Sequence, residues 1–361
     1  VHLSSYPAGG IKLVGVKNQK LRGYGATYGN IVIDNTNGIS LVGNATINGR
    51  LIFENGLLYI DDYLLTLGVN ATVEGAFDNH KMIILNGALS DLGVRKMFPS
   101  GASSQFTIPI GVDGKYTPAT YTITSSTTPG AITVRPVNRE HPALNDIVAN
   151  ELQYYWNVDA TGFGADLQLT HKYQYVEEDT TGDVDQYVVG LYHYETYTWD
   201  NLGRVGNPGK VNKVDNTFEV IDVSYATGDF TAGYSGNFVP LPIYYSRNSG
   251  SWTVPSNWST VGHDDNTSIA TIPPRGNPII IAVGHTMEIN ADQQMQASVE
   301  INGVLDFGKT VFHNLGNVYG TGKIILESTD CGCYVFPAGD YEQFLNTYGT
   351  EVELTGSNNS I

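Results

Sequence analysis

The sequence predicts an all-β fold in which right-handed parallel β-helix (solenoid) segments flank a β-sandwich. Three observations predict it. Glycine (41) and tyrosine (23) are abundant in the 361 residues, and short runs of Val, Ile, Thr and Tyr alternate with Gly and Asn, as in strands joined by tight turns. A set of motifs occurs twice in the same order. The chain between the two copies instead holds longer strands.

The internal repeat consists of three matched pairs of segments. Ile47-Asn48-Gly49-Arg50-Leu51 recurs as Ile301-Asn302-Gly303-Val304-Leu305. In the same order, residues 81–85 recur approximately as 323–326, and 98–101 as 336–339. The separation between the copies shrinks along the chain, as it does when loops between strands differ in length. The repeat indicates two related structural segments.

The first segment, residues 1–115, is predicted to be a solenoid. Its short apolar runs leave too little chain for helical crossovers, so they suit coils stacked upon one another, with Asn and Gly at the corners. A meander of hairpins is the competing interpretation, because Asn-Gly is also a hairpin signal. The predicted strands cover residues 11–16, 31–33, 39–42, 45–47, 51–53, 57–60, 64–67 and 82–85.

The middle segment, residues 116–238, predicts a β-sandwich of immunoglobulin or jelly-roll size. Residues 192–199 form an aromatic run that a lectin would also show, but we expect Trp156 and Trp199 in the core. A second solenoid segment covers residues 239–361, and short helices are conceivable at 142–153 and 341–345. The predicted sandwich strands are 119–125, 131–136, 151–158, 166–175, 186–194, 217–223 and 228–234.

Composition restricts the function classes. The net charge is −17, with 36 acidic and 19 basic residues, which repels nucleic acid and anionic membrane surfaces. No apolar run approaches the roughly 18 residues that a spanning helix needs. We therefore expect no nucleic-acid partner and no membrane insertion.

One acidic loop is a candidate calcium site. Asp179, Asp183 and Asp185 place three carboxylates within seven residues, and hard oxygen ligands suit Ca²⁺. The loop lacks the full twelve-residue EF-hand spacing, so a solvated loop is the alternative. No other cofactor is expected.

The two cysteines, Cys331 and Cys333, are separated by one glycine. Two such ligands are too few for a tetrahedral zinc site, and a bridge so short is strained unless the backbone turns. Two thiols, a local disulfide and a metal site are the interpretations, in that order.

Parallel β-helices are a common fold of polysaccharide lyases and hydrolases. The acidic residues are therefore considered as candidate catalytic groups. Such sites need acids that converge on one face. The adjacent acids at 61–62, 177–179 and 264–265 point to opposite faces of a strand or lie in turns. His285 has no acidic partner at an informative spacing. We therefore expect no enzyme.

A family resemblance appears in the third segment. Its residues 244–252 read Tyr-Tyr-Ser-Arg-Asn-Ser-Gly-Ser-Trp, and Trp258-Ser259, Gly284-His285-Thr286-Met287 and the Ile-Asn-Gly-Val-Leu motif follow. This pattern resembles the repeated module of very large surface proteins of bacteria with a type IX secretion system, including gliding-motility adhesins. Residues 154–158 and 191–199 resemble its interspersed sandwich domain. Cys-Gly-Cys is not part of the pattern.

The resemblance implies a secreted, acidic cell-surface protein that acts in cell adhesion and gliding motility. Within residues 179–181, Asp-Thr-Thr resembles the acceptor for O-glycosylation of proteins exported by these bacteria, so Thr180 is a candidate glycosylation site. We expect the chain to be a segment of a longer protein that serves as a rigid display rod. The expected partners are neighbouring repeats of the same chain, with surface glycans or other cells as further candidates. A carbohydrate-binding or polysaccharide-degrading β-helix module is the alternative.

Overall fold

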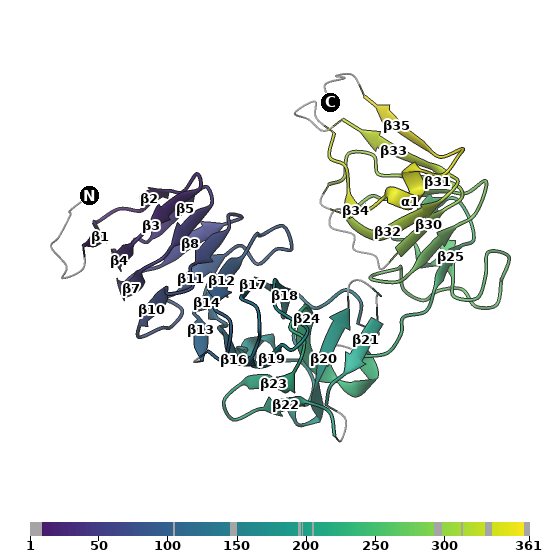
Figure 1. Ribbon diagram of the computed structural model, residues 1–361. Helices are drawn as coiled ribbons and strands as arrows, with labels where there is room; N and C mark the ends of the chain where they lie inside the picture. The colour runs from purple at the N-terminus through teal and green to yellow at the C-terminus, as the bar shows by residue number, and fades with distance from the viewer. Residues whose placement is uncertain are drawn as a thin grey trace. The chain divides into compact units, whose positions relative to one another are not determined.

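The computed structural model describes residues 9–103, 105–144, 150–193, 196, 198–203, 206–291, 298–311, 313–328 and 334–356 (Figure 1). The chain is nearly all β, with stacked parallel coils, which confirms the predicted fold class. It forms two compact units. Unit 1 contains nearly all the described residues up to Phe238, and unit 2 contains those from Val239 onward.

The first half of unit 1 is a parallel β-solenoid built from three sheets. The chain passes from the first sheet to the second and third and then returns, so each strand pairs in parallel with the one a coil later. Gly10 pairs with Asn30 and Ile31 with Leu51, a separation of 20 residues. The first sheet contains β1 (Gly10–Val14), β4 (Asn30–Asp34), β7 (Arg50–Asn55) and β10 (Thr72–Gly75); the second β2 (Gln19–Arg22), β5 (Ile39–Val42), β8 (Leu58–Asp61), β11 (Ile83–Leu85), β14 (Ile110–Val112) and β15 (Lys115–Tyr116); the third begins with β3 (Ala26–Tyr28), β6 (Ala45–Ile47), β9 (Leu65–Leu67) and β12 (Val94–Phe98).

The predicted strands of this segment all occur in the structure. Their parallel pairing over about one coil rules out the hairpin meander as the arrangement of these strands. The strands of this segment after residue 85 were not predicted, and neither were the earlier strands β2, β3 and β10. These three early strands are short and largely exposed: β2 buries only Leu21, and β3 and β10 bury no residue.

The inward side chains of successive coils form apolar ladders. Ile31 stacks on Leu51 and Ile33 on Phe53, and all four are buried. Burial of such a side chain stabilises the fold by about 1.5–3 kcal/mol. The corners are tied by asparagine: Asn44 Oδ1 accepts a hydrogen bond from the Leu64 N–H one coil later, at 2.9 Å.

The repeated Ile-Asn-Gly-x-Leu motif forms the same corner in both units. In residues 47–51 and 301–305, Ile ends one strand, Leu lies in the next, and both are fully buried. A Cβ on Gly303 would clash with the carbonyl oxygens of Ala282 and His285 in the preceding coil. The glycine is therefore required because neighbouring coils approach closely at the corner.

The second half of unit 1 is the β-sandwich, and its main sheet is a continuation of the third solenoid sheet. β12 pairs in parallel with β9 on one side and antiparallel with β17 on the other. The strands of this nine-stranded sheet beyond β12 are β17 (Gly130–Val137), β18 (Tyr155–Thr161), β24 (Gly228–Tyr234), β20 (Tyr187–His193) and β21 (Thr198–Asn201). The second layer contains β13 (Phe106–Ile108), β16 (Ala119–Ser125), β19 (Gln168–Gln174), β23 (Thr217–Val223) and β22 (Gly209–Asn212).

The solenoid and the sandwich share one core as well as one sheet. The buried apolar cluster of unit 1 runs from Leu13 to Ala232. The predicted boundary between residues 115 and 116 falls inside β15, and β12 and β13, which precede it, serve as sandwich strands. The structure therefore has no break at that position.

The tryptophans of the middle segment lie in the core, as predicted. Trp156 is fully buried and Trp199 nearly so. In β20, Leu191 and Tyr192 point to opposite faces of the sheet, and both are buried because this strand is covered on both faces. The aromatic run is thus core packing in the part that the structure describes, while residues 194, 195 and 197 lie outside it.

In its described residues, unit 2 is a second parallel solenoid with two sheets and one short α-helix. The predicted helix at 341–345 is confirmed as α1 (Glu342–Leu345). The helix considered at 142–153 is described only in part, and there Glu151 and Leu152 form isolated β-bridges. The first sheet contains β27 (Trp258–Ser259), β25 (Tyr244–Ser246), β28 (Ile279–Ile281), β30 (Ser298–Ile301), β32 (Asn314–Gly320) and β34 (Ala338–Asp340); the second β26 (Gly250–Ser251), β29 (Thr286–Glu288), β31 (Val304–Asp306), β33 (Lys323–Glu327) and β35 (Glu351–Thr355).

The motif residues of unit 2 hold its first coils together. Trp252 and Trp258 are fully buried with ring centroids 5.0 Å apart, and the Trp258 indole N–H donates to the Trp252 carbonyl at 2.9 Å. His285 Nδ1 lies 2.8 Å from the hydroxyl of Ser246, which is itself fully buried. The Ser246 hydroxyl is thus closed to solvent and serves as a structural partner of His285.

Candidate functional site

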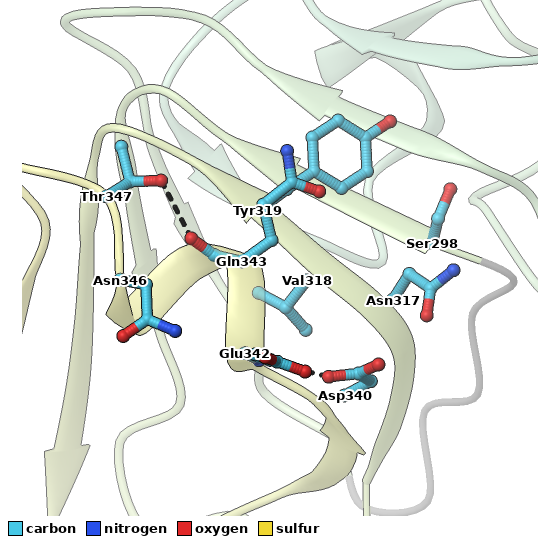
Figure 2. A pocket seen from close by; sticks show the side chains of 9 residues that line it. All are labelled: Ser298, Asn317, Val318, Tyr319, Asp340, Glu342, Gln343, Asn346 and Thr347. Atoms are coloured by element: carbon cyan, nitrogen blue, oxygen red, sulfur yellow. Dashed lines mark hydrogen bonds between the residues drawn. The ribbon is translucent and has the colours of Figure 1, made fainter.

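A cavity of about 740 Å³ lies beside α1 in unit 2 (Figure 2). Such a volume is within the range of small-molecule sites. Its lining is polar, with amide, carboxyl and hydroxyl groups and one tyrosine, and without any Lys, Arg or His. The lining residues are Ser298, Asn317, Val318, Tyr319, Asp340, Glu342, Gln343, Asn346 and Thr347.

One wall of the cavity is strand β32. Asn317 and Tyr319 are two residues apart and so project from the same face, while Val318 between them is buried in the core. Burial and the nearby Glu300 carboxylate raise the pKa of the Tyr319 phenol. The phenol is therefore a neutral hydrogen-bond donor at physiological pH.

The opposite wall is α1 and the residues around it. Phe344 is fully buried and anchors the helix, which leaves Glu342 and Gln343 exposed at the cavity. Asp340 Oδ1 accepts from the Glu342 N–H at 3.0 Å, and the Thr347 hydroxyl donates to the Gln343 carbonyl at 2.7 Å (Figure 2). These bonds hold the wall in place.

The sequence did not reveal this cavity. Its residues come from two strands, a strand end and a helix spread over residues 298–347, and apart from the buried Val318 each is an ordinary polar residue in its own segment. The weak helix at 341–345 was the only available indication. The arrangement offers many hydrogen-bonding groups of both kinds beside an aromatic ring.

The structure does not bring the three carboxylates of the predicted calcium loop together. Asp179 is buried and forms an ion pair with Lys115. Asp183 accepts from the Asp185 N–H at 3.0 Å, and the Asp185 carboxylate pairs with Lys213. In the part of the chain that the structure describes, no group of three or more His, Cys, Asp or Glu side chains could hold a metal ion. The geometry gives the calcium prediction no support.

The other predicted site residues are placed as follows. Thr180 is half-buried, and its hydroxyl donates to the Glu177 carbonyl at 2.8 Å, so its glycosylation stays a prediction. Cys331 and Cys333 lie outside the described residues.

Of the adjacent acids considered for catalysis, Asp61 ends β8, Asp62, Asp264 and Asp265 lie in turns, and residues 177–179 form a 3-10 turn. Asp61 has a positive φ of 48°. The Asp265 carboxylate accepts hydrogen bonds from Thr267 and Ser268, which lowers its pKa to about 2. Such carboxylates shape the local backbone.

Lys96 is an unpredicted polar residue in the core of unit 1. Its ammonium group donates to the carbonyls of Gly68, Val69 and Ala71 at 2.7, 2.9 and 3.1 Å and lies 4.6 Å from the Phe106 ring centroid. Burial lowers the pKa of Lys96 to about 8. Its place in β12, with carbonyl partners from the preceding coil, indicates a structural role.

None of the helices in the described part of the chain combines the length and the apolar character needed to cross a membrane. No protein-family model, no curated protein and no solved structure matches the chain.

Proposed function

We propose that the chain is a structural and adhesive segment of a large secreted cell-surface protein, in which it serves as a stiff display rod. The observation that supports this proposal is the coil stacking in both units. Each coil pairs in parallel with its neighbours, and its apolar side chains continue a buried ladder. Stability then comes from contacts between neighbouring coils, so further repeats extend the rod.

The motif residues shared with the adhesin-like modules also support this function. The buried Trp252 and Trp258 and the hydrogen bond between the buried Ser246 hydroxyl and the half-buried His285 hold the coils. Adhesion through such a segment would come from weak contacts multiplied over many repeats. The proposed setting is outside the cell, with type IX secretion and gliding motility as the associated processes, and without an enzymatic activity.

Antibodies raised against the purified chain are expected to label intact cells that produce the parent protein. Deletion of the coding segment is expected to reduce attachment or gliding of those cells, measured on glass and on host surfaces. Labelling only after cell lysis, or release of reducing sugar ends from polysaccharides by the purified chain, would contradict the proposal.

Carbohydrate binding at the cavity beside α1 is a second candidate. The specific observation is the lining, in which Asn317, Gln343 and Asn346 supply amides that both donate and accept and Tyr319 supplies a ring. Sugar hydroxyls need both kinds of partner, and a sugar face packs on an aromatic ring. The carboxylates of Asp340 and Glu342 favour a neutral sugar over an anionic one.

Tyr319→Ala and Asn317→Ala are expected to weaken binding of a neutral oligosaccharide at least about tenfold, the equivalent of 1.4 kcal/mol. Ligands would be selected on a glycan array and measured by isothermal titration calorimetry. Tyr348→Ala is the matched control, because Tyr348 is fully exposed and outside the cavity lining. Equal affinity in all three variants would exclude the cavity as the binding site.

A further inference from the structure

A lysine, an asparagine and a buried aspartate converge in unit 1. Lys115 lies in β15, Asn138 follows the last residue of β17, and Asp179 ends the 3-10 turn η1 (Glu177–Asp179). The Lys115 Nζ donates to Asn138 Oδ1 at 2.7 Å and to Asp179 Oδ1. Segments distant in the sequence thus place an amine between a carboxamide and a carboxyl group.

The backbone fixes all three residues. The Asn138 N–H donates to the Gly87 carbonyl at 3.0 Å, and the Asp179 carbonyl accepts from the Gln153 N–H at 2.8 Å. Lys115 is held by the β14–β15 pair. The juxtaposition is therefore a property of the fold.

Asp179 is unusual for a residue in an ion pair. Its side chain is 4% exposed against 27% for Lys115, and Asp179 Oδ2 is buried without a hydrogen-bond partner among the described residues. Burial raises the pKa of Asp179, although Lys115 opposes this shift. Beneath the amine lies the fully buried Tyr154, whose ring centroid is 5.8 Å from Nζ. A carboxylate in this setting is a stronger base than a solvent-exposed aspartate.

The geometry also brings the amine near the carboxamide carbon. Nζ is 2.7 Å from Asn138 Oδ1, and a C=O bond is about 1.23 Å long, so the carbon is at most about 3.9 Å away. A reactive approach needs about 3–3.5 Å. Asn138 is exposed, and a rotation of its carboxamide about the Cβ–Cγ bond would change the distance from Nζ to Cγ.

We propose that Lys115 and Asn138 form an intramolecular isopeptide bond, with Asp179 as the catalytic acid and base. The Lys115 ammonium gives a proton to the Asp179 carboxylate, and the neutral amine attacks Asn138 Cγ. Asp179 protonates Oδ1 of the tetrahedral intermediate and takes the second amine proton. Asp179 passes this proton to Nδ2, and the Cγ–Nδ2 bond breaks as ammonia leaves. The Oδ1 hydroxyl returns its proton to Asp179 as the amide C=O forms, and the released ammonia takes up that proton as ammonium. The balance is one ammonium and one carboxamide converted to one secondary amide and one ammonium ion, with no oxidant and no cofactor.

The bond would connect β15, the last strand of the second solenoid sheet, to the residue that follows β17 in the main sheet of the sandwich. It would close a covalent loop over residues 115–138, which limits the freedom of the unfolded chain. This inference goes beyond the proposed adhesive function and stands or falls independently of it.

Intact-mass measurement of the full chain is expected to give a value about 17 Da below the sequence mass, because ammonia is lost. Tandem mass spectrometry of a digest is expected to find one branched peptide containing both Lys115 and Asn138. Lys115→Arg and Asn138→Ala should each restore the mass expected for the variant. Asp179→Asn retains both reacting groups and should also restore it.

Succinimide formation at an Asn-Gly pair also removes ammonia, so the control must separate the two reactions. A succinimide takes up water in mild base, whereas the isopeptide amide does not, and a succinimide would persist in Lys115→Arg. Detection of the branched peptide in the wild-type chain would demonstrate the isopeptide bond even if a variant fails to fold. A full sequence mass without a branched peptide, after prolonged incubation at pH 8–9, would overturn the proposal and leave an ordinary ion pair.

Discussion

Replacement of Trp156 by alanine is expected to lower the free energy of unfolding of unit 1 by about 3–5 kcal/mol. The indole is fully buried, and its N–H donates to the Thr117 carbonyl at 3.1 Å. The rings of Tyr154, Tyr173 and Phe218 surround it at centroid distances of 5.0, 5.3 and 5.4 Å. Alanine would leave a cavity between both layers of the sandwich and a carbonyl without its donor.

The effect would be measured by urea denaturation and by thermal melting followed by circular dichroism. In a unit of this size each kcal/mol shifts Tm by about 2–4 °C, so a fall of roughly ten degrees is expected. Val214→Ala is the control, since Val214 is 84% exposed. A melting temperature within about a degree of the wild type would show that this packing contributes little.

Acid is expected to destabilise unit 1 through His171. This residue is fully buried, with Nδ1 3.0 Å from the Tyr173 hydroxyl and the Phe230 ring centroid 4.7 Å away. Burial lowers the pKa of His171 to about 3, against about 6.5 in an unfolded chain. Between these values the unfolded state binds a proton that the folded state does not. Stability is therefore lost as the pH falls below about 6.5, by up to about 1.4 kcal/mol per pH unit.

His171→Phe keeps a ring of similar size but removes the titrating group. The free energy of unfolding, measured between pH 7 and pH 4.5, should therefore fall less steeply in this variant than in the wild type. The expected difference in slope is about 1.4 kcal/mol per pH unit at the acid end. His80→Gln, at an exposed position, should retain the wild-type slope. Parallel curves for His171→Phe and the wild type would mean that another group governs the acid response.

Local pattern was sufficient to predict the coils but not the sheet that joins them to the sandwich. The Ile-Asn-Gly-x-Leu corners were visible because glycine and alternation are local properties. The strand β12 reads like any other short strand in the sequence, yet it pairs with β9 on one side and β17 on the other. Pairing across such distances is a tertiary property, and the boundary drawn at residue 115 missed it for that reason.

The candidate sites were less predictable than the fold. The calcium interpretation counted acids along residues 179–185, but Asp179 is bound by Lys115, 64 residues earlier. The cavity beside α1 gathers common surface residues that have no motif. Lys96 is found only in the structure, since its three acceptors are backbone carbonyls, which carry no sequence information.

The two-sided pairing of β12 has a consequence for how the protein behaves in a crowded solution. A stack of parallel coils ends in a strand with free N–H and C=O groups, and such an edge readily accepts a strand from another molecule. In the third sheet, the antiparallel strands that begin with β17 and β18 pair with this edge of the coil stack. These strands belong to the same chain and do not continue the coil. The sandwich thus terminates the stack in this sheet and protects it against end-to-end polymerisation, so a chain without β17 and β18 should form filaments or aggregates.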